Sequence, residues 1–94
     1  MSNQGTQGKL PIQMPDDVLP GKYANQMMVA HTREEFVLDF INLFPPGGVV
    51  TSRVIVSPGH LKRMIRAMRE NLDRYEAVHG PVIEAEPPPD TPKN

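Results

Sequence analysis

Residues 34–65 read EEFVLDFINLFPPGGVVTSRVIVSPGHLKRMI, and this stretch decides the fold. Residues 35–44 are rich in aromatic and β-branched side chains, a composition typical of a strand. The PPGG run at residues 45–48 cannot continue the strand and turns the chain. Residues 49–56 are again rich in valine and isoleucine and alternate between two faces. The stretch therefore predicts two strands joined by a tight turn.

A helix start follows directly at Ser57 and Pro58. A serine side chain can accept hydrogen bonds from the free amides of the first turn, and a proline at the first helical position loses no bond. Apolar residues then recur at helical spacing until Gly80 and Pro81 end the pattern. We predict a helix over residues 58–79, which corresponds to ~33 Å. Its apolar stripe consists of Leu61, Ile65, Met68, Leu72 and Tyr75, widened by Met64, Ala67 and Val78.

The flanking sequence adds one strand and two tails. Residues 23–31 alternate between two faces and predict a first strand. Residues 1–20 carry glycines and prolines among polar residues, so we expect a disordered or loosely docked arm. Residues 82–94 form an acidic, proline-rich tail that favours polyproline II and is expected to be disordered. The predicted fold class is α+β: a three-stranded antiparallel meander (β-β-β-α) in a single domain at residues 21–81.

The predicted strand at residues 35–44 is apolar on both faces, and one helix can cover only one of them. Either the N-terminal arm covers the second face or a second copy does. The folded core is small and has no disulfide to stabilise it, which favours the second copy. We expect a homodimer or a higher even-numbered oligomer. The expected interface residues are Phe36, Leu38 and Phe40 on one face and Val37, Ile41 and Leu43 on the other.

The sequence offers little catalytic chemistry. The 94 residues include no cysteine, which excludes thiolate metal sites and cysteine nucleophiles. The three histidines share no metal-ligand spacing. Asp39 is unexpected in an apolar strand, and we expect it to pair with Arg53 or to lie exposed at the sheet edge, because a catalytic carboxylate would need a second acid–base group. We therefore expect no catalytic, cofactor-binding or metal-binding residue and no enzymatic activity.

Four cations crowd the N-terminal half of the predicted helix, where the helix dipole is already positive. Acids follow at a spacing of four residues, so one interpretation is a solvated face with salt bridges. The other is contact with an anionic partner: the acidic tail of another copy, another protein or nucleic acid. No aromatic residues interleave with the cations and the net charge is −1, so we do not expect nucleic acid to be the partner. The cations are Lys62, Arg63, Arg66 and Arg69.

The location of the protein is constrained by what the chain lacks. Its N-terminus has no positive cluster followed by a long apolar run, as a signal peptide would have. No stretch approaches the roughly 18 apolar residues of a membrane span. We therefore expect a cytoplasmic protein without membrane contact.

Three segments together resemble a known family. They are HTREEFVLDF at residues 31–40, RVIVSPGHLKR at residues 53–63 and NLDRYE at residues 71–76, with the Pro-Pro turn between the first two. The chain is similar over roughly residues 23–80 to the bacterial and archaeal family called domain of unknown function 3467. That family has no established activity, cofactor or substrate, so the resemblance implies a small prokaryotic protein and transfers no site residue.

The leading functional hypothesis is a small non-enzymatic, oligomeric module for protein interaction or scaffolding. One alternative is a nucleic-acid-binding regulator that uses the basic helix face. Another is a chaperone-like assembly that holds extended peptides against an apolar sheet. The methionines of the chain suit adaptable binding, but they suit core filling more often. They are Met27, Met28, Met64 and Met68.

Overall fold

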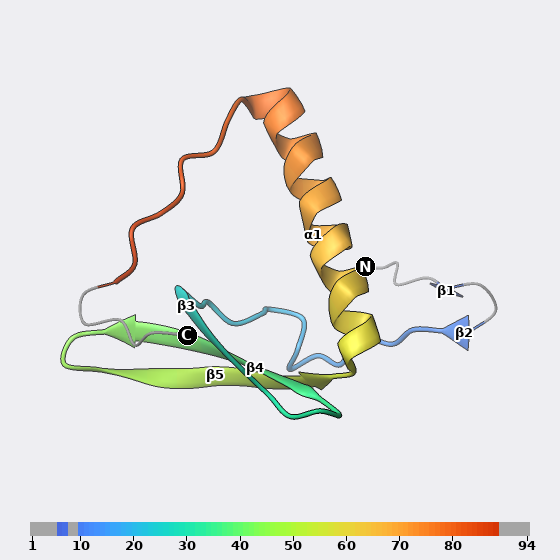
Figure 1. Cartoon of the computed structure of the whole chain (residues 1–94), viewed down its shortest axis with the longest axis horizontal. Coiled ribbons are helices and arrows are strands. Elements are labelled where there is room, and N and C mark those ends of the chain that lie inside the picture. The colour runs from blue at the N-terminus through green and yellow to red at the C-terminus, as the bar shows by residue number, and fades with distance from the viewer. Residues whose placement is uncertain (1–5, 8–9, 89–94) are drawn as a thin grey trace.

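The computed structural model describes residues 6–7 and 10–88. It confirms the α+β class and the predicted order of three antiparallel strands followed by one helix (Figure 1). A short hairpin that the sequence did not predict precedes them. The elements are β1 (Thr6–Gln7), β2 (Leu10–Pro11), β3 (Gln26–His31), β4 (Phe36–Phe44), β5 (Gly47–Val56) and α1 (Pro58–His79).

The main sheet has the order β3-β4-β5, with β4 in the centre. Leu38 of β4 lies opposite Val29 of β3 and Val54 of β5, so these three side chains share one face. Between Phe40 and Ile41 the register shifts. There Thr51 has no partner residue on β4, and its hydroxyl donates a hydrogen bond to the Phe40 carbonyl at 3.1 Å. This β-bulge keeps the alternation of β4 intact on both sides of the shift.

The β3–β4 connection closes around Thr32. Its hydroxyl oxygen accepts hydrogen bonds from the amides of Glu34 and Glu35, both at 3.2 Å. The Thr32 amide in turn donates to the Glu35 carbonyl at 2.9 Å. The polar residues between the two predicted strands therefore form a turn, and the side chain of its first residue, Thr32, stabilises it.

All three strands begin at a different residue than predicted, and β4 does so by one residue, at Phe36 instead of residue 35. The first strand begins at Gln26 instead of residue 23, because the Asn25 side chain takes over the pairing with Leu43: its Oδ1 accepts from the Leu43 amide at 2.8 Å and its Nδ2 donates to the Leu43 carbonyl at 3.0 Å. The third strand begins at Gly47, two residues early. A Cβ atom at Gly48 would lie 2.6 Å from Leu43 Cδ1, so glycine lets this end of β5 pair closely with β4.

The helix has the predicted bounds. Ser57 Oγ accepts a hydrogen bond from the His60 amide at 3.1 Å, and Pro58 occupies the first turn. Gly80, with φ of 91°, ends it, and its amide donates to the Glu76 carbonyl at 2.9 Å. These contacts are the ones that the Ser-Pro and Gly-Pro pairs predict.

The expectation that this helix covers a face of the sheet is wrong. The structure describes all of α1, and none of its residues is buried. Figure 1 shows α1 leaving the end of β5 and standing away from the sheet. The connection between β5 and α1 is the single residue Ser57 in an extended conformation, which is too short to turn the helix back over the strands.

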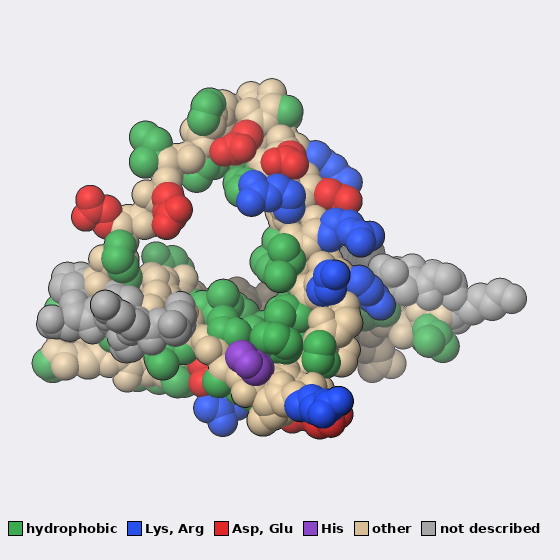
Figure 2. Space-filling model, viewed as in Figure 1, with side chains coloured by type: hydrophobic (Ala, Val, Ile, Leu, Met, Phe, Trp, Pro, Cys, Tyr) green, Lys and Arg blue, Asp and Glu red, His purple; other side chains and the backbone are tan. Residues whose placement is uncertain are grey.

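The buried core is correspondingly small. Within residues 10–88, only Leu38 at 3% exposed and Ile41 at 8% exposed are buried hydrophobic residues. They lie at the middle of the central strand, and the strand alternation points them to opposite faces. Figure 2 shows the consequence as an open hollow between the sheet, α1 and the C-terminal segment, with hydrophobic side chains facing it.

The two predicted tails are described in part. Residues 15–21 form tight turns, with the Pro15 carbonyl accepting from the amides of Val18 and Leu19. Residues 81–88 leave α1 and return toward the β4–β5 end of the sheet (Figure 1). Residues 1–5, 8–9 and 89–94 of the predicted tails lie outside the described residues. The boundaries of the predicted domain at residues 21–81 stay a prediction.

Candidate functional site

The apolar stripe of α1 is the most conspicuous surface of the molecule. Leu61 and Met64, near the base of the helix, are half-buried. Beyond them the stripe is open to water along the rest of the helix. The exposed fractions are 57% for Ile65, 59% for Met68, 39% for Leu72, 53% for Tyr75 and 76% for Val78. In Figure 2 hydrophobic side chains of the helix face the hollow above the sheet, whereas most of its Lys and Arg side chains lie on the other side.

The six residues predicted for the interface all lie on β4, but the chain itself already covers part of this set. Leu38 and Ile41 are buried within one copy, and the other four are half-buried. A central strand is shielded by a neighbour on each side, so its apolar side chains expose less than those of an edge strand. The larger exposed surface lies on the edge strand β5, where the exposed hydrophobic residues are Val49, Val50, Val54 and Ile55.

Asp39 and Arg53 form the predicted ion pair across β4 and β5. The contact is bidentate, with Arg53 Nε 2.7 Å from Asp39 Oδ1 and Arg53 Nη2 2.9 Å from Asp39 Oδ2. The hydrogen bonds from Arg53 lower the pKa of Asp39, and the same carboxylate raises the pKa of Arg53. The carboxylate is therefore held ionised, which suits a structural role better than proton transfer.

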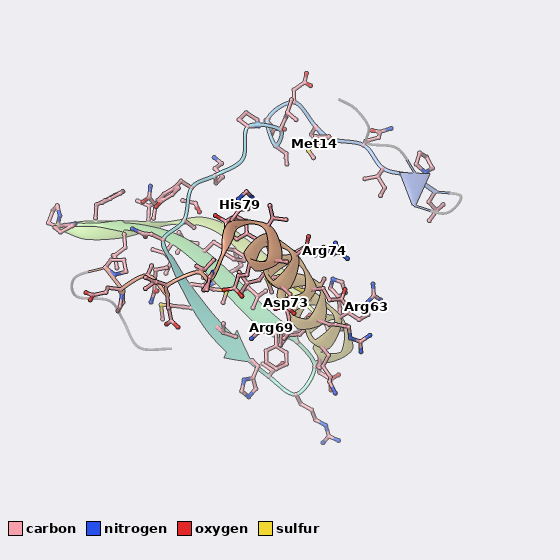
Figure 3. All side chains as sticks on the ribbon, turned by 90° about the horizontal axis from the view of Figure 1, so that it is seen from above. Met14, Arg63, Arg69, Asp73, Arg74 and His79 are labelled. Carbon is pink, nitrogen blue, oxygen red and sulfur yellow. The ribbon has the colours of Figure 1, made fainter. Side chains whose placement is uncertain are left out.

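The four predicted cations of α1 are all exposed. The predicted salt bridges along the helix are not formed, since within the described part of the chain the Arg53–Asp39 contact is the one ion pair. Exposed pairs of long side chains gain little and lose rotamer freedom, which explains why they stay open. Arg63 and Arg69 project to different sides of α1 (Figure 3), so the cations do not gather into one compact patch.

The histidines make ring contacts instead of ligand clusters. The His31 ring lies 5.1 Å from that of Phe36, and the His79 ring lies 4.7 Å from that of Tyr75. Across residues 6–7 and 10–88, no group of three or more His, Cys, Asp or Glu side chains could hold a metal ion. Among the described residues, no helix is both long enough and apolar enough to cross a membrane.

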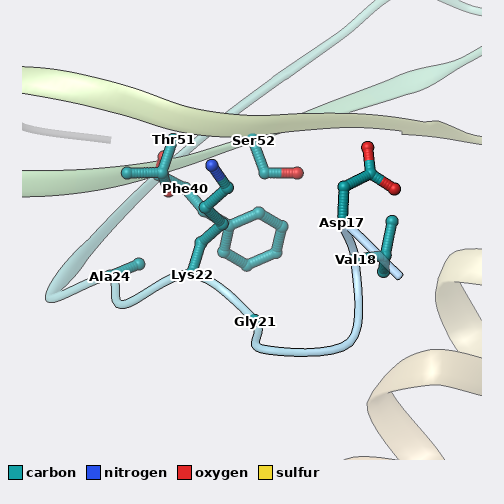
Figure 4. A pocket seen from close by; sticks show the side chains of 8 residues that line it. All are labelled: Asp17, Val18, Gly21, Lys22, Ala24, Phe40, Thr51 and Ser52. Carbon is teal, nitrogen blue, oxygen red and sulfur yellow. The ribbon is translucent and has the colours of Figure 1, made fainter. Parts of the chain in front are cut away.

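The bulge between β4 and β5 borders a hollow of about 550 Å³ that sequence reasoning missed. Figure 4 shows the arm looping past the sheet, with the Phe40 ring between the two. Thr51 and Ser52 line it from β5, and Asp17 of the arm and Lys22 just after it line the other side. The register shift beside this hollow comes from strand pairing, and no residue pattern in the sequence marks it.

A second hollow, of about 510 Å³, lies at the far end of the sheet. Phe44 lines it from the end of β4 and Tyr23 from just before β3, while Ala85, Glu86 and Pro88 line it from the C-terminal segment. In the sequence, the two aromatic residues mark ends of predicted strands, and the prolines belong to the predicted tail. Neither pattern alone signals that the fold brings them together.

The sequence model of the family described as Protein of unknown function (DUF3467) matches residues 1–84. The chain belongs to this family. The match confirms the resemblance predicted from residues 23–80 and extends it through the N-terminal arm. No curated protein and no solved structure matches the chain.

The family match also shows which parts of the candidate sites lie within the family's sequence pattern. The DUF3467 match includes Asp17 and Lys22, which line the hollow beside the bulge, and the whole apolar stripe of α1. It ends at residue 84, before Ala85, Glu86 and Pro88 of the C-terminal segment. The hollow beside the bulge and the exposed helix therefore lie within the part of the chain that matches the DUF3467 family.

Proposed function

We propose that this DUF3467 protein is a cytoplasmic, non-enzymatic, self-assembling interaction module. Two copies, or a higher even number, complete each other's core. The single observation that carries the proposal is the exposure of the apolar stripe along α1, a helix of 22 residues described in full and without a buried residue. Most of the stability of a protein helix comes from packing its apolar face, so a helix of this kind needs a partner surface.

The size of the exposed surface suits a subunit interface. The stripe is ~33 Å long and, at a width of about 10 Å, offers on the order of 300 Å². The exposed side chains of β5, which leads directly into α1, add to it. The largest apolar patch on a soluble monomer has about this size and is often functional. A two-fold interface buries about 800 Å² per partner, so the stripe needs further apolar surface from the sheet beside it.

A second copy is the simplest partner because each copy carries both halves of the contact. The helix presents an apolar stripe, and the sheet presents apolar side chains toward the hollow beside it (Figure 2). An isologous dimer uses the same patch on both subunits, so no further component is required. Another protein with an apolar helix or strand would fit the same surface, which is the role of an interaction module.

Sedimentation equilibrium of the full chain at low micromolar concentration tests the proposal. We expect a species of twice 10.5 kDa or a larger even multiple of that mass. A folded monomer of 10.5 kDa would contradict it. A folded monomer that binds unfolded client peptides on the same surface would favour the chaperone-like alternative instead.

The rival with an observation of its own is nucleic-acid binding, because Lys62, Arg63, Arg66 and Arg69 are exposed and unpaired with acids. Contacts with phosphates make affinity fall steeply with salt. We expect no binding to duplex DNA or RNA tighter than ~10 µM near physiological salt, because the chain carries a net charge of −1. Micromolar binding that the double variant R63E/R66E abolished would replace the interaction module with a regulator.

A further inference from the structure

The C-terminal segment leaves α1 in a fixed direction. Gly80 takes a positive φ of 91°, a conformation that glycine adopts freely, and turns the chain out of the helix. The Val82 amide then donates a hydrogen bond to Glu76 Oε2 at 2.8 Å. The segment that follows contains no helix or strand through residue 88, and it returns to the end of the sheet (Figure 1).

At that end the segment meets two aromatic side chains. Tyr23 precedes β3 and Phe44 ends β4, and together with Leu43 and Pro45 they line the hollow of about 510 Å³. Pro88 of the returning segment lines its other side and is half-buried. We call the strand side of this hollow the Tyr23–Phe44 groove.

The chemistry of the two sides matches a known mode of recognition. Residues 84–89 read EAEPPP, and consecutive prolines favour the extended polyproline II conformation before any contact forms. Grooves walled by aromatic rings bind such segments because little conformational entropy is lost on docking. A proline has no amide hydrogen, so such a segment cannot add to the sheet as a further strand.

We propose that the Tyr23–Phe44 groove is a docking site for a proline-rich peptide of a partner protein, and that the chain's own segment 84–88 occupies it as a competing internal ligand. The partner segment has the chemistry of the internal one: extended, acidic and rich in consecutive prolines. This site is separate from the assembly surface, since it involves neither the stripe of α1 nor the exposed side chains of β5 named above.

The internal ligand leaves room for exchange. Tyr23 remains 69% exposed and Phe44 59% exposed although the segment runs beside them. A peptide that covers both rings more fully would gain apolar contact that the internal segment does not make. The internal segment has the advantage of being tethered, which gives it a high effective concentration. If it fills the groove in about nine molecules of ten, the apparent affinity for an external peptide is about tenfold weaker than the intrinsic one.

The test uses the full chain and a synthetic peptide with its own residues 82–94, VIEAEPPPDTPKN. The double variant P87G/P88G keeps the length and charge of the segment but removes its preference for polyproline II. Binding is followed by NMR shift changes of aromatic side chains. We expect this variant to bind the peptide about five- to tenfold more tightly than the unchanged protein. A peptide with alanine in place of its four prolines should not bind.

The groove is checked by Y23S and F44S, each made in the P87G/P88G chain. Tyr23 lies outside β3, so Y23S keeps the sheet intact and isolates the loss of the ring. Both changes should abolish binding, whereas L19S, which removes an apolar side chain that is 61% exposed and lies outside the groove and the stripe, should leave it unchanged. No binding by P87G/P88G, or binding that survives Y23S and F44S, would overturn the site. Equal affinity with and without P87G/P88G would overturn the competition.

These outcomes are independent of the assembly. Sedimentation of the same variants reports the oligomeric state separately, and we expect P87G/P88G and Y23S to leave it unchanged. A monomeric protein that still shows the peptide exchange would refute the proposed function and leave the groove standing.

Discussion

β4 and α1 are both strongly apolar segments, yet one is partly enclosed by its own chain and the other is not. β4 has a neighbouring strand on each side, joined to it by short turns at Thr32 and at the Pro45-Pro46 pair. α1 is joined to the sheet only at Ser57 and projects away from it (Figure 1). Backbone pairing between adjacent strands encloses a central strand without help from distant parts, whereas a helix needs a separate surface to pack on.

The largest expected effect tests the enclosed region. Leu38→Asp would place a carboxylate at the middle of β4, where the present side chain is 3% exposed. Burying an unpaired charge costs several kcal/mol, which is comparable to the whole stability of a small domain. We expect the variant to be unfolded by circular dichroism at 25 °C. Ile83→Asp, at a residue that is 92% exposed, is the matched control and should keep the native spectrum.

The next effect tests the open region. Met68→Glu places a charge in the stripe of α1 and should weaken self-association at least hundredfold, because burying methionine contributes ~1.5 kcal/mol or more in each of two subunits. The measurement is sedimentation over a concentration series. Arg66→Glu is the control on the opposite side of α1 and should change the dissociation constant less than threefold, although it alters the charge by two. Equal weakening by both variants would show that charge, and not the stripe, controls assembly.

A smaller effect sharpens the boundary of the sheet. Asn25→Ala removes the two side-chain hydrogen bonds to the Leu43 backbone. Each such bond contributes about 1 kcal/mol, so we expect a loss of roughly 1–2 kcal/mol in urea unfolding. Asn71→Ala is the matched control, since its amide makes one exposed bond to the Ala67 carbonyl, and it should change stability by less than about 0.5 kcal/mol. If Asn25→Ala lowered the stability no more than Asn71→Ala, backbone pairing of β3 with β4 would have extended to replace the lost side-chain bonds.

The smallest expected effect concerns the Asp39–Arg53 pair. Because Arg53 lowers the pKa of Asp39 below its ordinary value of 3.8, the pair stabilises the folded state fully above pH 3.8 and loses this contribution as the pH falls through the lowered pKa. Urea unfolding from pH 5 to pH 2 should therefore show a shallower loss of stability for Asp39→Asn than for the unchanged chain. Identical slopes would mean that the pair does not contribute.

Much of the fold could be predicted because its signals are local. The helix bounds followed from Ser57-Pro58 and Gly80-Pro81, whose capping contacts involve residues within one turn. The Asp39–Arg53 pair followed from two strands that are adjacent in the chain. The bulge at Thr51 and the role of Asn25 could not be predicted, because each depends on which backbone groups of another strand remain free to bond.

The candidate sites could likewise be predicted only in part from the sequence. The sequence predicted the apolar stripe of α1, its exposed cations and the apolar β4, because spacing alone places residues on a helix or strand face. It could not predict that α1 stands away from the sheet, nor that Tyr23, Phe44 and Pro88 share one groove, since both depend on the direction in which the chain leaves an element. The sequence by itself determined which segments become the helix and the three strands of the main sheet, through local periodicity and capping. The tertiary structure alone decided which apolar surfaces stay uncovered, because burial depends on contacts between residues far apart in the chain.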